Sequence, residues 1–188
     1  MKQSKNDINL GRCISFILRH RPEDFNIKLD SHGWADVNEL ISNMNIKGHK
    51  IDRQTLDRIV RENNKQRYTY NQDGTKIRAN QGHSIKVDVE LSETVPPQKL
   101  YHGTAKATLD AIREKGIMKM TRNHVHLSSD IETAFTVGKR HGNPVVLVID
   151  TAKMYADGIK FYISENKVWL CDYVAFDYVM DIIYKENK

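Results

Sequence analysis

The chain has 188 residues, of which 39% are hydrophobic and 28% charged, and its formal net charge is +5. This length fits one larger domain or two small lobes, and the composition is that of an ordinary soluble globular protein. No apolar run reaches the roughly 18 residues that span a membrane, and residues 1–7 have no signal-peptide character. We therefore expect a cytoplasmic protein, whose modest positive charge is compatible with a nucleic acid partner.

The first half of the chain has the pattern of three helices. Apolar residues between Leu10 and Leu18 recur at helical spacing, and this helix should end near Arg21 because Pro22 disfavours helical geometry in the residue before it. A capping-box pattern that begins at Asp36 predicts a second helix, and Asp52 is placed to cap a third.

A β-hairpin is predicted after the third helix, with Asp73-Gly74 as a two-residue loop. This register pairs Thr69 with Arg78 and Arg67 with Asn80, and these four residues then share one polar, cationic face. A solvated surface is the simplest interpretation of that face. The opposite face, expected in the core, carries Tyr68, Tyr70, Ile77 and Ala79. Three helices followed by a hairpin indicate a winged-helix lobe.

A domain boundary is predicted at Ser92–Gln98, because Pro96 and Pro97 interrupt both helices and sheets. The proposed domains are residues 1–92 and 98–188, although a loop within one domain would give the same pattern.

The second half reads as short strands with two helices, which indicates an α+β lobe built on small sheets. One helix around Leu109 should stop at Gly116, and another should start after Ser129 or Asp130 with Phe135 pointing inward. The expected strands are Leu100–His102, Val125–Leu127, Val145–Ile149, Phe161–Ile163, Val168–Leu170 and Val174–Phe176.

Several short segments could carry chemistry. Arg19-His20-Arg21 could bind an oxyanion, or it could only complement the partial charge at the helix C-terminus. Asn80–Ser84 contains a glycine that would permit close approach to a ligand, or it could be only the exit turn of the hairpin. His102-Gly103-Thr104 ends a strand and could hold a polar ligand, although a lone histidine is more often structural.

A metal site is not expected. His124 and His126 would lie on one strand face, but no acidic residue or cysteine stands near them to complete a ligand set. Walker, GxGxxG, GxSxG and HExxH motifs do not occur, so any dinucleotide would have to bind outside a Rossmann fold.

Taken together, these segments resemble the tRNA 2′-phosphotransferase family, in that family's order and over nearly the whole chain. The resemblance rests on Leu18-Arg19-His20, Gly33-Trp34-Ala35, Arg67-Tyr68, Ile77–Ser84, Leu100–Thr104, Val125–Ser128, Gly138–Gly142 and Val168-Trp169-Leu170. It implies an α+β fold with an N-terminal winged-helix lobe, a C-terminal ADP-ribosyltransferase-like lobe and a cleft between them.

The resemblance also implies the reaction. An internal RNA 2′-phosphate attacks C1″ of NAD and expels nicotinamide, and the ribose O2″ then attacks phosphorus in the RNA–phospho–ADP-ribose intermediate. The products are RNA with a 2′-hydroxyl and ADP-ribose 1″,2″-cyclic phosphate. The family's usual substrate is the splice junction of tRNA, NAD is consumed as a co-substrate, and neither a metal nor an obligate protein partner is implied.

The family's catalytic Arg-His-Arg-Arg set corresponds here to Arg19, His20, Arg67 and Arg122. Guanidinium groups suit a phosphomonoester that carries about −1.5 to −2 charges, and they would stabilise the charge that develops during transfer. His20 is expected to polarise the phosphate or to help proton transfer.

The resemblance further implies binding residues. The residues expected to face NAD are His102, Gly103, Thr104, His126, Ser128 and Asp130. The residues expected to contact RNA are Arg78, Asn80, Gln81 and His83. Arg78 and Arg140 could contact the RNA backbone or NAD phosphates, or they could be plain surface charges.

Two rival functions remain open at this point. An ADP-ribosyltransferase that caps terminal phosphates of nucleic acids, or modifies a protein, would share the first chemical step and stop there. A winged-helix protein without enzymatic activity would bind no NAD.

Overall fold

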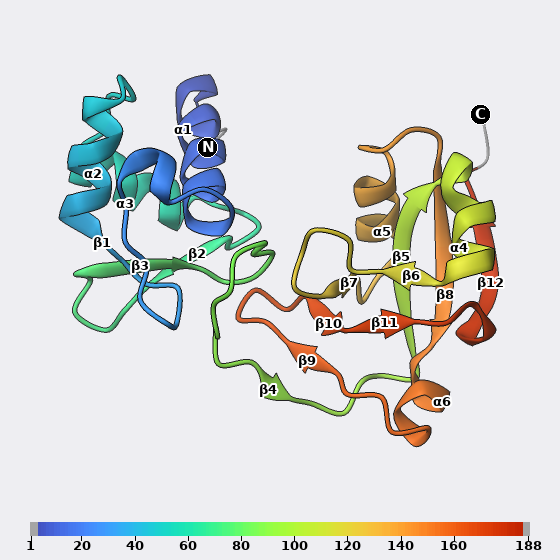
Figure 1. The fold of residues 1–188 in the computed structure, drawn as a ribbon. Helices are drawn as coiled ribbons and strands as arrows, with labels where there is room; N and C mark the ends of the chain where they lie inside the picture. Colours follow the sequence, from blue (N-terminus) through green and yellow to red (C-terminus); the bar gives the residue numbers. More distant parts are fainter. Residues whose placement is uncertain (1–3, 186–188) are drawn as a thin grey trace. The chain divides into compact units, whose positions relative to one another are not determined.

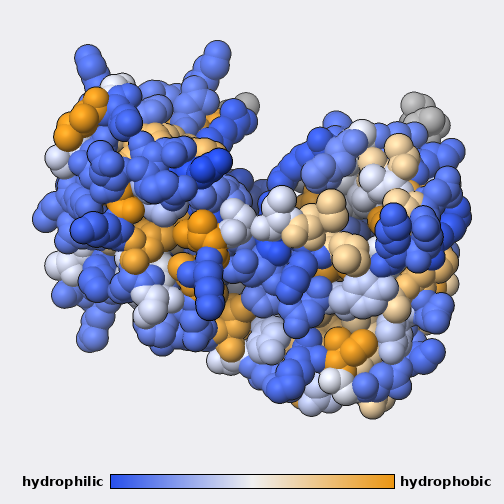
Figure 2. Space-filling model, viewed as in Figure 1, coloured by the Kyte–Doolittle hydropathy of each residue, from blue (hydrophilic) through white to orange (hydrophobic). Residues whose placement is uncertain are grey.

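The computed structural model describes residues 4–185, and its internal contacts divide the chain into two units between Glu90 and Leu91 (Figure 1). Both units combine short helices with small antiparallel sheets, as an α+β fold requires. The surface seen in Figure 2 is mostly hydrophilic, with apolar side chains in small patches. Within the described part of the chain, no helix is long and apolar enough to cross a bilayer.

The first unit follows the predicted helix order. Its elements are α1 (Lys5–Arg19), η1 (Glu23–Phe25), β1 (Ala35–Asp36), α2 (Val37–Ile46), α3 (Arg53–Arg61), β2 (Tyr68–Tyr70) and β3 (Lys76–Ala79). The predicted caps are confirmed, because the Asp36 carboxylate accepts the Glu39 N–H in the first turn of α2, and the Asp52 carboxylate accepts the Thr55 N–H in the first turn of α3. Helix α1 ends at Arg19, two residues before the expected end, since His20 already leaves helical geometry with φ −131°.

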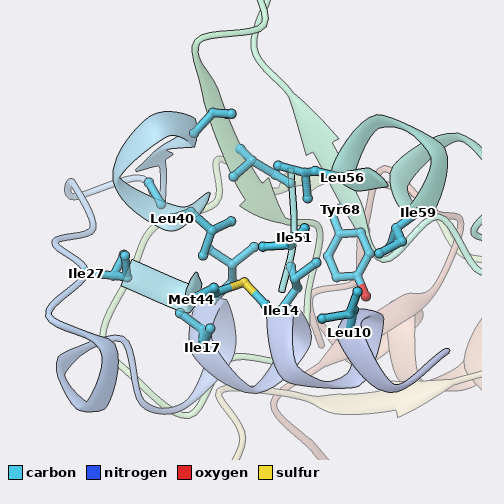
Figure 3. Close-up of a cluster of buried hydrophobic side chains, with 14 of the residues drawn as sticks. Leu10, Ile14, Ile17, Ile27, Leu40, Met44, Ile51, Leu56, Ile59 and Tyr68 are labelled. Carbon is cyan, nitrogen blue, oxygen red and sulfur yellow. The ribbon is translucent and has the colours of Figure 1, made fainter. Parts of the chain in front are cut away.

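The three helices enclose one apolar core (Figure 3). Ile14 and Ile17 of α1 meet Met44 of α2 and Leu56 of α3, and all four are at most 1% exposed. Burial of each such side chain stabilises the fold by about 1.5–3 kcal/mol. One face of α1 is thereby fixed against the core, and its other face remains available for other contacts.

The hairpin has the predicted register but a longer loop. Tyr68 pairs with Ala79 and Thr69 with Arg78 in a sheet of order β1-β3-β2. The loop begins after Asn71, whose N–H donates to the Lys76 carbonyl, so the expected two-residue turn is wrong. The Asp73 carboxylate instead accepts hydrogen bonds from Thr75, and these stabilise a four-residue loop.

The polar face of the hairpin is not a solvated surface. Arg78 is 8% exposed and Asn80 is 5% exposed, so that interpretation is wrong for both residues. Trp34 lies under the Arg78 guanidinium, 4.5 Å from the ring centre, and Glu90 pairs with Arg78 at 3.0 Å. The sequence pattern could not reveal these partners because they lie outside the hairpin.

Within residues 91–185, the second unit contains two main sheets and one short strand pair, all antiparallel. The first sheet has the order β4 (Ser92–Glu93), β9 (Tyr162–Ile163), β10 (Trp169–Cys171) and β7 (Val125–Leu127). The second has the order β12 (Val179–Tyr184), β8 (Pro144–Asp150) and β5 (Lys99–Ala105). The short pair is β11 (Tyr173–Val174) and β6 (Ile117–Met118). The helical elements are η2 (Lys106–Thr108), α4 (Leu109–Lys115), α5 (Ile131–Gly138), α6 (Thr151–Ala156) and η3 (Phe176–Tyr178).

Most predicted elements of this unit are present. Strand β7 and the stop of α4 at Gly116 are confirmed, and α5 starts after Asp130. Phe135 is only half-buried, and Ala134 and Gly138 are the buried residues of α5. The last predicted strand stops at Val174, and the long strand β12 was not predicted.

The two main sheets meet at one point. Tyr101 of β5 and Ser128, just after β7, exchange backbone hydrogen bonds of 2.9 and 2.8 Å. The other edge of β5 pairs with β8 along seven residues. His102, the residue after this bridge, therefore lies where the two sheets join.

Candidate active site

A groove of about 340 Å³ in the first unit brings together Arg19, His20 and Arg67. One wall is the face of α1 that does not contact the core, and the other includes Asn63 and Tyr68. Three of the four residues predicted to be catalytic thus line the same cavity. The third of them, Arg67, is 47 residues from His20 in the sequence, and the turn after α3 brings it back to the helix end.

The segment after the hairpin fastens the end of α1. The Arg19 carbonyl accepts the N–H of Ser84 at 2.9 Å. Gly82 adopts φ +87°, a conformation that favours glycine, and an ideal Cβ there would lie 3.6 Å from the Arg19 Cζ atom. The glycine of Asn80–Ser84 therefore permits a backbone turn directly against the Arg19 guanidinium.

The His20 ring is held through one nitrogen. Its Nδ1 lies 2.9 Å from the Ser84 hydroxyl oxygen, and a hydroxyl can either donate to or accept from that nitrogen. Either neutral tautomer of His20 therefore keeps the same bond. Ser84 was not among the predicted site residues, although it ends the quoted segment Asn80–Ser84.

Arg67 is held by both its side chain and its backbone. Its Nη1 donates to the Asn63 carboxamide at 3.2 Å, and its carbonyl accepts the Asn80 N–H at 2.9 Å. Beside it, the Tyr68 hydroxyl donates to the Gly11 carbonyl of α1. These contacts fix β2 against α1 and define the floor of the groove.

The residues predicted to contact RNA have structural partners inside the first unit. Arg78 stacks on Trp34 and pairs with Glu90, and the Asn80 amide donates to the Gln66 carbonyl at 2.7 Å. Gln81 is half-buried. The RNA contacts themselves stay a prediction.

His83, the fourth residue predicted to contact RNA, is 3% exposed and lies near Arg19 of the groove. Burial, together with the nearby Arg19, His20 and Arg78 cations, lowers the pKa of His83 to about 4. The ring is therefore neutral near pH 7, and it adds no charge to the crowded cations around it.

In the second unit, His102 is fixed at the junction of the two sheets. Its Nδ1 lies 3.1 Å from the His126 carbonyl, and this nitrogen must be the donor because a carbonyl only accepts. Burial lowers the pKa of His102, the His126 hydrogen bond opposes this shift, and the nearby His141 adds to it. The ring is thus a neutral tautomer whose Nε2 is an acceptor.

Gly103 and Thr104 have clear structural functions. An ideal Cβ on Gly103 would lie 1.7 Å from the Ala134 carbonyl oxygen, so only glycine permits α5 to pack on β5. The Thr104 hydroxyl lies 2.8 Å from the Thr108 hydroxyl, which itself donates to the Ala105 carbonyl. The Thr104 proton is consequently used within the protein.

The other residues predicted to face NAD lie nearby. His126 supplies the carbonyl that fixes His102, and Ser128 supplies the bridge to β5. The Asp130 carboxylate caps α5 by accepting the Thr133 N–H at 2.7 Å. Their contacts with NAD remain predictions.

Arg122, the fourth predicted catalytic residue, is in the second unit, in the turn between β6 and β7. Its side chain is solvent-exposed, yet surrounding protein and the nearby Arg140 cation lower the pKa of its guanidinium. Arg122 and Arg140 thus form a small cationic pair. Across residues 4–185, no group of three or more His, Cys, Asp or Glu side chains is arranged to hold a metal ion.

Residues 5–173 match the family described as RNA 2′-phosphotransferase, Tpt1 / KptA family. The match covers most of the chain, so the protein belongs to this family, and the resemblance seen in the sequence is confirmed. The family is one of transferases, which confirms the expected enzyme class.

Similar proteins carry the same description over their full lengths. The chain is 57% identical to a probable RNA 2′-phosphotransferase of Fusobacterium nucleatum, over 93% of this chain and 98% of that protein. It is 50% identical to one of Flavobacterium johnsoniae, over 91% and 94% of the two chains. It is 41% identical to one of Pseudomonas syringae pv. tomato, over 97% of each.

Proposed function

We propose that the protein removes an internal 2′-phosphate from RNA, as at a tRNA splice junction, and transfers it to the ADP-ribose of NAD. Nicotinamide, 2′-hydroxyl RNA and ADP-ribose 1″,2″-cyclic phosphate would be released. The main observation behind this proposal is that Arg19, His20 and Arg67 line the same groove. Family membership supports it.

We also infer the two lobe types. The order α1-β1-α2-α3-β2-β3, with a sheet of order β1-β3-β2, supports a winged helix for the first unit. Two small sheets that join beside His102 support an ADP-ribosyltransferase-like lobe for the second. The reaction is expected in the cytoplasm.

Arg19 and Arg67 are the proposed phosphate ligands. The RNA 2′-phosphate carries about −1.5 to −2 charges at neutral pH, and two guanidinium groups in one groove can neutralise it through paired N–H donors. The groove contains one carboxylate, Asp7, and Arg58 pairs with it at 3.0 Å. Repulsion between Asp7 and the bound phosphate is therefore reduced. Arg122 is proposed as the fourth member of the set.

His20 is the proposed proton carrier, and Ser84 is its positioning residue. Transfer of the phosphate requires a group that can give or take a proton at the phosphate oxygens or at the attacking ribose hydroxyl. Because the Ser84 hydroxyl can donate or accept, the His20 Nε2 can be an acid or a base without rotation of the ring.

His102 is the proposed ligand of NAD. When bound, NAD would supply an electrophilic ribose carbon and a nicotinamide leaving group. The donor chemistry fits, because the fixed acceptor nitrogen of His102 suits a ribose hydroxyl, which donates. The Thr104 hydroxyl is a weaker candidate, since its proton already bonds Thr108.

The test is a short RNA with one internal 2′-phosphate, labelled on that phosphate and incubated with and without NAD. Label in ADP-ribose cyclic phosphate, only when NAD is present, is the expected result. Label retained on RNA joined to ADP-ribose would instead favour the ADP-ribosyltransferase alternative. Unchanged RNA would exclude both activities and leave an RNA-binding protein.

A further inference from the structure

Helix α1 lines the groove with two parallel rows of side chains. Residues four apart stack along one helix face, each step rising about 6 Å along the axis. The inner row consists of Gly11, Ser15 and Arg19, and the outer row of Ile8, Arg12, Phe16 and His20. Only the last residue of each row has a place in the proposed phosphate transfer, which leaves most of this groove without an assigned ligand.

Phe16 exposes a large aromatic ring in this groove. It is 44% exposed, although its neighbours Ile14 and Ile17 are completely buried in the core. Its ring centre lies 6.2 Å from that of His20, with the planes tilted by 51°. An exposed ring one helical turn from His20, the proposed proton carrier, is an available stacking surface for a nucleobase.

Arg12 adds an available cation one turn further along the row. Its side chain is exposed, and among residues 4–185 it has no hydrogen bond or ion pair. Other arginines of this unit are paired, as Arg53 is with Asp57 and Arg58 with Asp7. The Arg58 hydrogen bonds keep the pKa of Asp7 below its usual value, so this groove carboxylate is ionised but compensated.

We propose that the outer row of α1 is a subsite for single-stranded RNA. The nucleotide that adjoins the 2′-phosphorylated residue stacks its base on Phe16, and its backbone phosphate contacts Arg12. This inference rests on the proposed function, which places the 2′-phosphate at Arg19, His20 and Arg67. Stacking is tolerant of base identity, so the subsite selects an unpaired nucleotide and not a sequence.

The geometry favours RNA over a peptide ligand for this groove. Aromatic faces beside arginines are the usual surface for unpaired nucleotides, whose bases stack while their phosphates pair with cations. The row runs directly into the proposed phosphate site, so one continuous strand can occupy both. Burial of Arg78, Asn80 and His83 agrees with RNA contacts that lie on α1 more than on the hairpin.

The test measures equilibrium binding of a short 2′-phosphorylated RNA by fluorescence anisotropy, without NAD. Phe16→Ala should weaken binding about 5- to 150-fold, the range for loss of one stacked base, and Phe16→Tyr should restore most of it. Arg12→Gln should weaken binding about 5-fold, as loss of an exposed charge contact would. Ile46→Ala removes an exposed apolar side chain from α2, outside the groove, and should leave affinity unchanged.

A second RNA, abasic at the nucleotide next to the 2′-phosphate, separates stacking from a change in folding. Wild type and Phe16→Ala should bind the abasic RNA equally. Equal affinity of the two proteins for the intact RNA would overturn the subsite, and so would an equal loss on both RNAs. Wild-type turnover with NAD is measured in parallel: Phe16-dependent binding without turnover would refute the proposed function alone, and turnover without Phe16 dependence would refute the subsite alone.

Discussion

The groove of the first unit and the sheet junction of the second each present a histidine, and the two rings are held differently. In the groove, Nδ1 of His20 meets a hydroxyl, and at the junction, Nδ1 of His102 meets a carbonyl. The Ser84 hydroxyl can hydrogen-bond either neutral tautomer of His20. The His126 carbonyl can only accept, so it selects the His102 tautomer that carries its proton on Nδ1. His20 is thus suited to move a proton, and His102 is suited to hold a ligand.

The charges around His20 and His102 also differ. The groove gathers the cationic side chains of Arg19 and Arg67, whereas the His102 ring is neutral and hydrogen-bonded to a backbone carbonyl. In the proposed reaction, the first unit would supply Arg19, Arg67 and the proton carrier His20, and the second would supply Arg122 and the fixed acceptor nitrogen of His102.

Replacement of a proposed catalytic residue in the groove should reduce the reaction rate more than any other change. His20→Ala or Arg67→Ala should lower the rate of 2′-phosphate removal about 10²- to 10³-fold, the range for one acid–base or charge-stabilising group. The second step should slow more than the first, so RNA joined to ADP-ribose should accumulate in a single-turnover assay. Arg61→Ala, at an exposed arginine of α3, is the matched control. An unchanged rate in His20→Ala would remove that residue from the mechanism.

Acid should destabilise the protein through His83. Its pKa is about 4 in the folded chain and about 6.5 when unfolded, so the unfolded state binds more protons as pH falls. The contribution of neutral His83 to the free energy of unfolding is fully present above about pH 6.5. It declines as the pH falls and is lost below about pH 4. The maximum loss is about 3 kcal/mol, at 1.36 kcal/mol per unit of pKa difference.

Urea unfolding at pH 7.5 and pH 4.5 measures this loss. His83→Gln removes the titrating ring and should show a smaller fall in unfolding free energy between the two pH values than wild type does. An equal fall in both proteins would assign the acid sensitivity to other groups.

Loss of His102 should affect NAD more than phosphate chemistry. His102→Ala removes one fixed hydrogen-bond acceptor and should weaken NAD binding about 10-fold. Calorimetric titration measures the Kd, and thermal unfolding of the same variant checks that the sheet junction survives. Affinity equal to that of wild type would exclude His102 from the NAD site.

The smallest effect is expected at Ser84. Ser84→Ala leaves His20 in place but removes its Nδ1 partner, so kcat should fall about 3- to 10-fold, the value of one hydrogen bond. The pH profile of kcat should shift, because the ring loses a partner that accepts both tautomers. Ser84→Thr keeps the hydroxyl and should restore both. An unshifted profile in Ser84→Ala would limit Ser84 to a structural function.

Local patterns predicted the elements of the fold well. Capping residues such as Asp36, Asp52 and Asp130 locate the start of a helix within a few residues. Placing Asp73-Gly74 at the centre of the hairpin loop gives the correct pairing of Thr69 with Arg78, although the loop itself is longer. Strand β12 could not be predicted because buried and exposed residues do not alternate along it, and half of its residues are exposed.

Long-range contacts limited prediction of the site. The sequence pattern places Arg78 on the surface of the hairpin. Its partners Trp34 and Glu90 lie outside the hairpin, so the pattern does not reveal that Arg78 is buried. At Gly103, the sequence predicts a ligand contact, whereas the requirement for glycine comes from the carbonyl of Ala134 on α5. No local pattern indicates a site function for Ser84, because its bond to His20 joins residues 64 apart.

The pairing of Arg78 with Glu90 has a consequence for how RNA binding would respond to salt. Affinity for a single strand falls with salt in proportion to the number of phosphates neutralised, with a slope of about −0.7 for each. An arginine already neutralised by a carboxylate displaces no counterions when RNA binds. The salt dependence would therefore not count Arg78, and its slope would be shallower than the number of arginines near the proposed RNA site suggests.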